Sequence, residues 1–158
     1  MFARRADRQI GIGLYGLDPS VDVSLPGDFR PALTWKTTVA QVKTLPPGMF
    51  VGYNNTYRTH NTEQIAVIPV GYADGFRRAP KHWGAVLVGG DFAPLVGRVS
   101  MDQTMINVSH IPGVAVGDEV VLIGKQGDKQ ITADDVAKQL GTSSYEVVST
   151  ILARVPRV

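Results

Sequence analysis

Tyr57 is the side chain of this sequence best placed to act as a base. It ends the string Tyr53-Asn54-Asn55-Thr56-Tyr57 and precedes the turn Tyr72-Ala73-Asp74-Gly75 by about fifteen residues. A phenol has an ordinary pKa of about 10, so it needs cationic or hydrogen-bonding neighbours to remove a proton near neutral pH. Taken by itself, Tyr57 is more typical of an aromatic residue at a strand end, with its hydroxyl hydrogen-bonded at the surface.

A second polar string, from Gly97 to Gln103, contains Arg98, Met101 and Asp102. A turn of this kind offers main-chain N–H groups, which bind an anionic group at little conformational cost. The plainer interpretation is a strand that ends in a polar turn, with Met101 as core filler.

Other polar residues do not form a recognisable site. The three histidines are dispersed and lack paired carboxylates nearby, so we predict no metal site. Asp134 and Asp135 suit the first turn of a helix better than an acid–base pair. The chain has no cysteine, which excludes disulfides and thiolate metal ligands.

Short strands separated by turns must position these residues. Residues 10–17 are interpreted as a buried strand and turn, and residues 18–31 as a connecting loop. Strands are expected in 33–45, 64–72, 85–90, 92–100, 104–109 and 117–124, and helices in 133–140 and 144–155. Gly89-Gly90-Asp91 joins a hairpin, Thr132 caps the first helix, and Ser143 or Ser144 caps the second. Arg154 and Arg157 suit the C-terminal dipole of the second helix. The fold class is therefore predicted as mainly β, a small closed Greek-key-like β-barrel with short C-terminal helices.

Composition limits the function classes. A chain of 158 residues with 44% hydrophobic and 19% charged residues is typical of a globular domain. It has no apolar run of about 18 residues and no secretion signal, so we expect a cytoplasmic protein that does not span a membrane. The net charge is only +2 and the basic residues are dispersed, which argues against nucleic-acid binding.

Residues 51–75, the string at 97–103 and the closing segment YEVVSTILARVPRV, taken in this order, resemble the C-terminal half of the alanine racemases. These are pyridoxal-phosphate (PLP) enzymes that interconvert L-alanine and D-alanine, a precursor of peptidoglycan. The resemblance covers nearly all of residues 10–158. It implies that Tyr57 is a catalytic base, and that the backbone N–H of Met101 helps to hold the substrate carboxylate, with Asp102 and Arg98 as further substrate-binding residues. Phe76 and Arg98 resemble positions along the substrate corridor, although a packed Phe and an exposed, salt-bridged Arg are equally plausible.

The same resemblance implies contacts with PLP. The Tyr145 hydroxyl and the amides of Gly11 and Ile12 would bind the cofactor phosphate, while Gln9 stands where the family has an arginine on the pyridine nitrogen. Tyr145 could instead be a helix aromatic that packs on the barrel. No lysine of this chain lies in a segment resembling the family's cofactor-binding lysine motif. We therefore expect the chain alone to bind no PLP tightly and to be inactive.

The implied organisation is a remnant of the PLP-binding barrel in 1–17, a linker in 18–31 and the alanine racemase C-terminal β-barrel domain in 32–158. The expected partners are the N-terminal PLP-barrel domain of the same enzyme, alanine, and a second copy, in a homodimer with a composite active site. Two alternatives remain open. One is a non-catalytic β-barrel that binds a ligand or partner; the other is a related PLP enzyme, such as a basic amino-acid decarboxylase or serine racemase.

Overall fold

A computed structural model describes residues 11–20 and 24–158 of the chain. Contacts divide the chain into two compact units, Met1–Leu33 and Thr34–Val158. In the first unit, the described residues contain one short 3-10 helix, η1 (Gly11–Tyr15). The predicted buried strand over 10–17 is therefore wrong, because Gly11 has a φ of 55°, a left-handed value that interrupts an extended chain. Gln9 and Ile10 lie outside the described residues.

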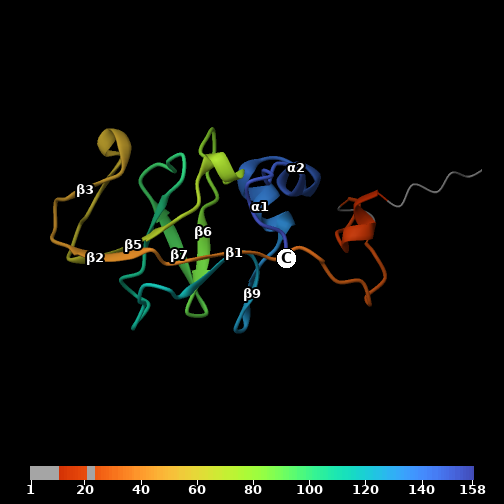
Figure 1. Cartoon of the computed structure of the whole chain (residues 1–158), viewed down its shortest axis with the longest axis horizontal. Coiled ribbons are helices and arrows are strands. Elements are labelled where there is room, and N and C mark those ends of the chain that lie inside the picture. Colours follow the sequence, from red (N-terminus) through yellow and green to blue (C-terminus); the bar gives the residue numbers. More distant parts are fainter. Residues whose placement is uncertain (1–10, 21–23) are drawn as a thin grey trace, which may run out of the picture. The chain divides into compact units, whose positions relative to one another are not determined.

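The second unit contains ten strands and two α-helices in its described residues (Figure 1). The strands are β1 (Trp35–Thr38), β2 (Gln41–Leu45), β3 (Phe50–Val51), β4 (Tyr57–Arg58), β5 (Glu63–Ile68), β6 (Ala85–Val88), β7 (Asp91–Val96), β8 (Thr104–Asn107), β9 (Glu119–Gln126) and β10 (Lys129–Ile131). The helices are α1 (Ala133–Leu140) and α2 (Ser144–Ser149), and two 3-10 turns are η2 (Tyr53–Asn55) and η3 (Tyr72–Asp74).

Eight strands form one antiparallel sheet in the order β1-β9-β6-β7-β8-β5-β2, with β10 paired to β9, while β3 and β4 pair separately. Because β6, β7 and β8 are consecutive neighbours and β5 lies beside β8, this part is a Greek key. The predicted closed barrel is wrong, since β1 and β2 form no pair with each other in the described chain. They are successive parts of one bent segment: the N–H of Val39 donates to Asp118, and that of Ala40 donates to Val67. The two ends of the sheet thus meet end to end instead of side by side.

The predicted β6–β7 hairpin is confirmed, with Val88 opposite Asp91. Gly89 and Gly90 have φ values of 57° and 81°. A two-residue hairpin loop of type I′ has positive φ at both positions, which matches the strand twist and explains the glycine pair.

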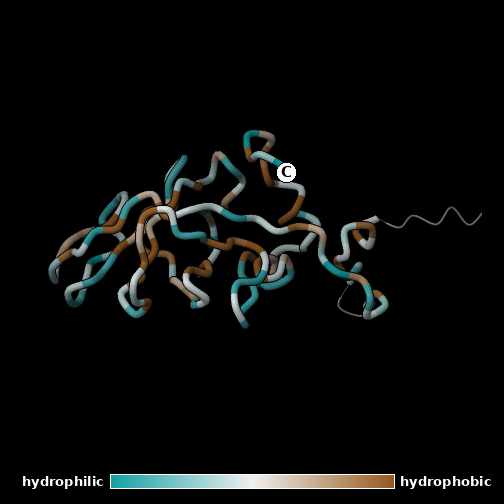
Figure 2. The backbone as a smooth tube through the Cα atoms, turned by 60° about the horizontal axis from the view of Figure 1, so that its bottom comes forward, coloured by the Kyte–Doolittle hydropathy of each residue, from teal (hydrophilic) through white to brown (hydrophobic). Residues whose placement is uncertain are grey.

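The core of the second unit is built around three aromatic rings. Trp35, Phe76 and Trp83 are all buried, with Phe76 stacked on Trp83 at a centroid distance of 4.6 Å and Trp35 edge-on to both. The indole N–H of Trp83 donates to the Leu122 carbonyl at 3.0 Å, so its one polar atom is satisfied inside the core. Figure 2 shows brown, hydrophobic stretches within the sheet and teal stretches at several loop ends.

Both predicted C-terminal helices exist. The Thr132 hydroxyl accepts from the N–H of Asp135, whose carboxylate accepts from the Thr132 N–H, so α1 begins with a capping box. Ser143 caps α2, which ends at Ser149 and is shorter than predicted. The Thr150 hydroxyl donates to the Glu146 carbonyl and occupies an acceptor of the last turn, where the helix ends. Among the described residues, no helix is long and apolar enough to cross a membrane.

Candidate functional site

The loop at 97–103, between β7 and β8, lies against two other loops of the second unit: 52–56, between β3 and β4, and 71–75, after β5. Glycines allow this approach. A Cβ on Gly97 would lie 2.6 Å from the Val51 carbonyl oxygen, and one on Gly71 would lie 2.3 Å from that of Met101. Backbone bonds join the same loops, from the N–H of Tyr72 to Ser100 and from that of Ala73 to Met101, each 3.0 Å long. The turn at 71–75 and the loop at 97–103, which lie far apart in sequence, are thus in direct contact.

Tyr57 is half-buried, and its hydroxyl donates to the carboxylate Oε2 of Glu63 at 2.6 Å. The amide of Asn107 donates to the same oxygen at 2.9 Å and lies 3.4 Å from the Tyr57 hydroxyl. Burial, the hydrogen bond to Glu63 and the negative charge of Glu63 raise the pKa of Tyr57, against a smaller lowering by Asn107. In this arrangement Tyr57 is a neutral hydrogen-bond donor.

Glu63 is a buried carboxylate, with only 7% of its surface exposed. Burial by itself raises the pKa of Glu63, but hydrogen bonds from the Tyr57 hydroxyl and from the backbone N–H groups of His60 and Asn61 outweigh it and lower the pKa. The His60 bond to Oε1 is 2.8 Å long. Glu63 is thus held ionised by neutral donors.

Tyr53 lies in the 52–56 loop, four residues before Tyr57, but its surroundings differ from those of Tyr57. It is 61% exposed, and its hydroxyl forms no hydrogen bond within the described chain. It lines a cavity of about 420 Å³ together with Ser100, the residue before Met101. The loop thus carries a phenol without a hydrogen bond, Tyr53, and is followed on β4 by a hydrogen-bonded one, Tyr57.

Met101 is 53% exposed, so the interpretation of its side chain as core filler is wrong. Its carbonyl accepts from Ala73, whereas its N–H donates to no other described residue. The N–H is therefore available to an anion, as the resemblance implies.

Asp102 is paired with Arg154. One guanidinium nitrogen lies 2.7 Å from Asp102 Oδ1, and another lies 2.7 Å from Oδ1 of Asp74 in the turn at 71–75. The hydrogen bond to Asp102 is the main cause of a raised pKa of Arg154. The helix-dipole interpretation of Arg154 is wrong, since α2 ends five residues earlier. Arg157 instead donates to the backbone carbonyls of Ile151, Leu152 and Val155.

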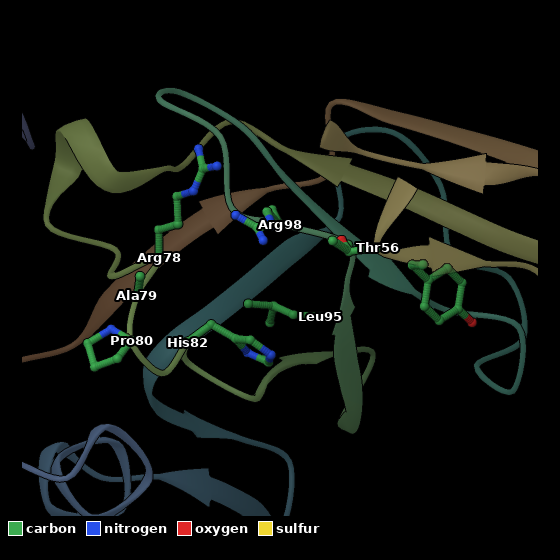
Figure 3. Close-up of a pocket in the computed structure, with 9 residues that line it drawn as sticks. Thr56, Arg78, Ala79, Pro80, His82, Leu95 and Arg98 are labelled. Carbon is green, nitrogen blue, oxygen red and sulfur yellow. The ribbon is translucent and has the colours of Figure 1, made fainter. Parts of the chain in front are cut away.

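Arg98 is exposed and forms no ion pair within the described chain, so the salt-bridged alternative is wrong. It lines a cavity of about 430 Å³ with Arg78 and His82 (Figure 3). A free guanidinium in a cavity suits a carboxylate ligand. Phe76 has 0% of its surface exposed, so the packed alternative is confirmed for that residue.

The remaining expected contacts are placed as follows. Tyr145 is the second residue of α2 and is 46% exposed. Gly11 opens η1, and a Cβ there would have nothing within 4 Å, so its backbone is approachable. Ile12 is buried. No group of three or more His, Asp or Glu side chains is arranged to hold a metal in the part of the chain that the structure describes.

Sequence reasoning missed Glu63 and Asn107. Glu63 lies two residues before the buried Ile65, and alternate residues of a strand share a face, which was the available signal. Asn107 gave no comparable sign, because its role depends on the pairing of β8 with β5, in which it lies opposite Ile65.

Comparisons with known proteins agree on one family. Residues 32–158 match the family model described as alanine racemase, C-terminal domain. Alanine racemase from Halothermothrix orenii is 52% identical over 147 residues, which is 93% of this chain and 39% of that protein. Alanine racemase 2 from Caldanaerobacter subterraneus is 49% identical over 148 residues, or 94% of this chain and 38% of that protein.

Solved structures give the same result. The crystal structure of alanine racemase from Bacillus anthracis with bound L-Ala-P superposes with a TM-score of 0.87 at 47% identity, over 94% of this chain and 38% of that one. Alanine racemase from E. faecalis gives a TM-score of 0.87 at 40% identity, over 93% of this chain and 39% of that one. The chain thus spans less than two fifths of each of these four relatives.

Proposed function

The chain belongs to the alanine racemase family, in which it matches the C-terminal domain, and we propose that it forms this part of an enzyme interconverting L-alanine and D-alanine. Enzymes of this family are PLP-dependent isomerases. Because the chain spans 38–39% of these relatives, the proposed enzyme has a further N-terminal domain that carries the cofactor-binding lysine.

Racemisation removes the α-proton from one face of the substrate and returns a proton to the other. A single base does not reach both faces of a substrate held on a cofactor, so two bases are needed. The cofactor-binding lysine is one, and this chain supplies the other as a tyrosine.

Sequence similarity pointed to Tyr57 as this base, but the geometry favours Tyr53. A base must reach the substrate with a free phenol oxygen, and Tyr57 is bound to Glu63 at 2.6 Å with a raised pKa. Tyr53 is exposed, unpartnered and shares a cavity with Ser100, beside the free N–H of Met101. This pairing of a free phenol with a free backbone donor is the observation that carries the proposal.

The Met101 N–H then holds the substrate carboxylate. Arg98, which lines a different cavity together with Tyr57, is kept as a further proposed substrate contact. Asp102 was expected among the substrate contacts. Its carboxylate would repel that of alanine and is already paired with Arg154, which favours a role in holding the Met101 loop.

PLP would supply the electron sink that makes the α-proton removable. The contacts that the resemblance implies are all with its phosphate: the Gly11 backbone, the amide of Ile12 and, on the second unit, the hydroxyl of Tyr145, which is exposed. Because the lysine belongs to the missing domain, the chain alone is expected to be inactive and to bind PLP weakly.

A composite site in a homodimer follows from the same proposal. Tyr53 and Met101 are exposed on this chain, so the substrate they contact must lie outside the described fold. The cofactor-carrying domain of a second copy is the proposed holder of that substrate.

The test compares Tyr53→Phe with Tyr57→Phe in the complete enzyme, by exchange of the α-hydrogen of each alanine enantiomer into D2O. Removing the true base should slow exchange of one enantiomer by about a hundredfold or more and leave the other nearly unchanged, because the lysine still serves its own face. We expect Tyr53→Phe to show this loss of about a hundredfold or more for one enantiomer only. If Tyr57→Phe gives the full asymmetry and Tyr53→Phe none, Tyr57 is the base; if neither does, the proposed tyrosine mechanism is wrong.

A further inference from the structure

Glu63 has features that the proposed chemistry does not use. Its buried carboxylate accepts from donors on separate segments, among them the Tyr57 hydroxyl on β4, the Asn107 amide on β8 and the His60 backbone N–H. Within the described chain no lysine or arginine forms an ion pair with it. Burying a charge is costly unless its donors are fixed, so this carboxylate holds its neighbours in a defined geometry.

The segment that needs holding is the loop before Tyr57. Asn54 and Asn55 have φ values of 61° and 50°, in the left-handed region that asparagine adopts more readily than most residues, and Gly52 has a φ of 77°. These residues form an irregular turn without ladder hydrogen bonds of its own within the described chain. Tyr53 lies inside this turn, so the direction of its phenol depends on how the turn is anchored.

Tyr57 is the first residue after the 52–56 loop and is one of the links between this loop and the main sheet. The strands β3 and β4 are two residues long and pair only with each other in the described structure. The Tyr57 ring packs against the small core cluster of Val51, Ile65 and Val96, and its hydroxyl reaches Glu63 at the start of β5. The packing of the Tyr57 ring fixes how far the end of the loop lies from the sheet, and the hydrogen bond of its hydroxyl fixes the orientation of the side chain.

We propose that Glu63 is a positioning residue, which acts through Tyr57 and Asn107 to fix the 52–56 loop and thereby aim the Tyr53 phenol at the substrate. The inference rests on the proposed function for the identity of the base. It assigns Tyr57 a mechanical role, and it makes the buried carboxylate part of the reaction machinery without contact with the substrate.

Glu63→Gln in the complete enzyme is the sharpest test. The amide keeps the shape of the side chain but replaces one acceptor oxygen by a donor, so the donors to Glu63 compete for one oxygen. The matched control is Glu119→Gln, the same change at an exposed carboxylate on β9 that is paired with Lys36 of β1. Tyr57→Phe and the double variant Tyr57→Phe with Glu63→Gln complete the set.

We expect Glu63→Gln to slow α-hydrogen exchange of one enantiomer by about tenfold to a hundredfold, since a misplaced base loses rate steeply. The affected enantiomer should be the one that Tyr53→Phe affects. Tyr57→Phe should give a similar, smaller asymmetry, and the double variant should be no worse than the larger single effect, because both remove one linkage. Backbone hydrogen exchange over residues 51–58 should rise in all three and stay unchanged in Glu119→Gln.

A merely structural role would give a different pattern. Loss of folded enzyme lowers exchange of both enantiomers in the same proportion, so equal losses in Glu63→Gln, or none, would overturn the inference while Tyr53→Phe remains asymmetric. If Tyr53→Phe itself shows no asymmetry, the proposed function fails instead. In that case unchanged hydrogen exchange over 51–58 in Glu63→Gln would separately overturn the anchoring role.

Discussion

At the residue scale, burial is the main cause of the raised pKa of Tyr57, and Glu63 is the neighbour that raises it further. Both the hydrogen bond to Glu63 and the charge of Glu63 raise the pKa of Tyr57, in addition to burial. Glu63→Gln should therefore lower the pKa of Tyr57, because burial, which raises the pKa, and Asn107, which lowers it, are the effects that remain. Tyrosinate absorbance, measured as the difference between each background with and without Tyr57→Phe, isolates this one phenol. An unchanged or higher pKa in Glu63→Gln would mean that the two side chains are not bonded in solution.

The same pair predicts how stability depends on pH. A raised pKa of Tyr57 means that the folded state holds the proton more tightly, so its contribution is complete below pH 10.0 and is lost as pH rises through the raised pKa. A lowered pKa of Glu63 contributes stability above pH 4.5, which is lost as pH falls through the lowered value. Denaturant unfolding across pH should show a steeper alkaline decline in the natural chain than in Tyr57→Phe. The unfolding free energy of the natural chain should also fall more steeply at acid pH than that of Glu63→Gln. Curves of unfolding free energy against pH that run parallel in the natural chain and the variants would contradict the prediction.

The contact between the turn at 71–75 and the loop at 97–103 can be tested at the scale of elements. Gly71 has an ordinary extended backbone, so alanine there is opposed only by crowding: its Cβ would lie 2.3 Å from the carbonyl oxygens of both Ser100 and Met101. Gly71→Ala should cost about 2 kcal/mol or more in unfolding free energy, because backbone atoms cannot rotate away. In the complete enzyme it should also raise the KM for alanine by displacing the Met101 N–H.

Gly27→Ala is the matched control, because a Cβ at Gly27 meets nothing within 4 Å and its φ is not left-handed. It should change the unfolding free energy by no more than about 1 kcal/mol, and any such change should be stabilising. Equal effects of the two substitutions would mean that the loops do not touch as described.

The sequence predicted an element correctly where a residue type in a short pattern is typical of a single backbone conformation. The glycine pair of the β6–β7 turn and the caps of α1 belong to this group, since their geometry is set within a few residues. Closure of the barrel was predicted wrongly, because it depends on long-range pairing at the bend between β1 and β2. There the N–H of Val39 donates to Asp118, just before β9, and that of Ala40 donates to Val67 on β5. Strand β10 was missed because three residues are too few to show a period. Among the site residues, the resemblance identified the motifs, but only the distances distinguish the free phenol of Tyr53 from the tied phenol of Tyr57.

The proposed composite site predicts complementation between inactive enzymes at the scale of the whole molecule. One variant carries Tyr53→Phe, and the other lacks the cofactor-binding lysine of the N-terminal domain. If Tyr53 serves the lysine of the partner, a mixed dimer contains one site with both bases and one site with neither. Random exchange of equal amounts should then restore about a quarter of the natural activity, since half the dimers are mixed and each has one complete site.

The measurement is racemase activity after the two purified variants are mixed under conditions that allow subunits to exchange, with each variant alone as the baseline. Mixing natural enzyme with the lysine-lacking variant controls for losses during exchange. If Tyr53 served the cofactor of its own subunit, every site in the mixed dimer would lack one base and no activity would return. Restored activity would therefore show that this chain completes a site in another copy, which explains why Tyr53 and Met101 are exposed on a domain whose own core is fully packed.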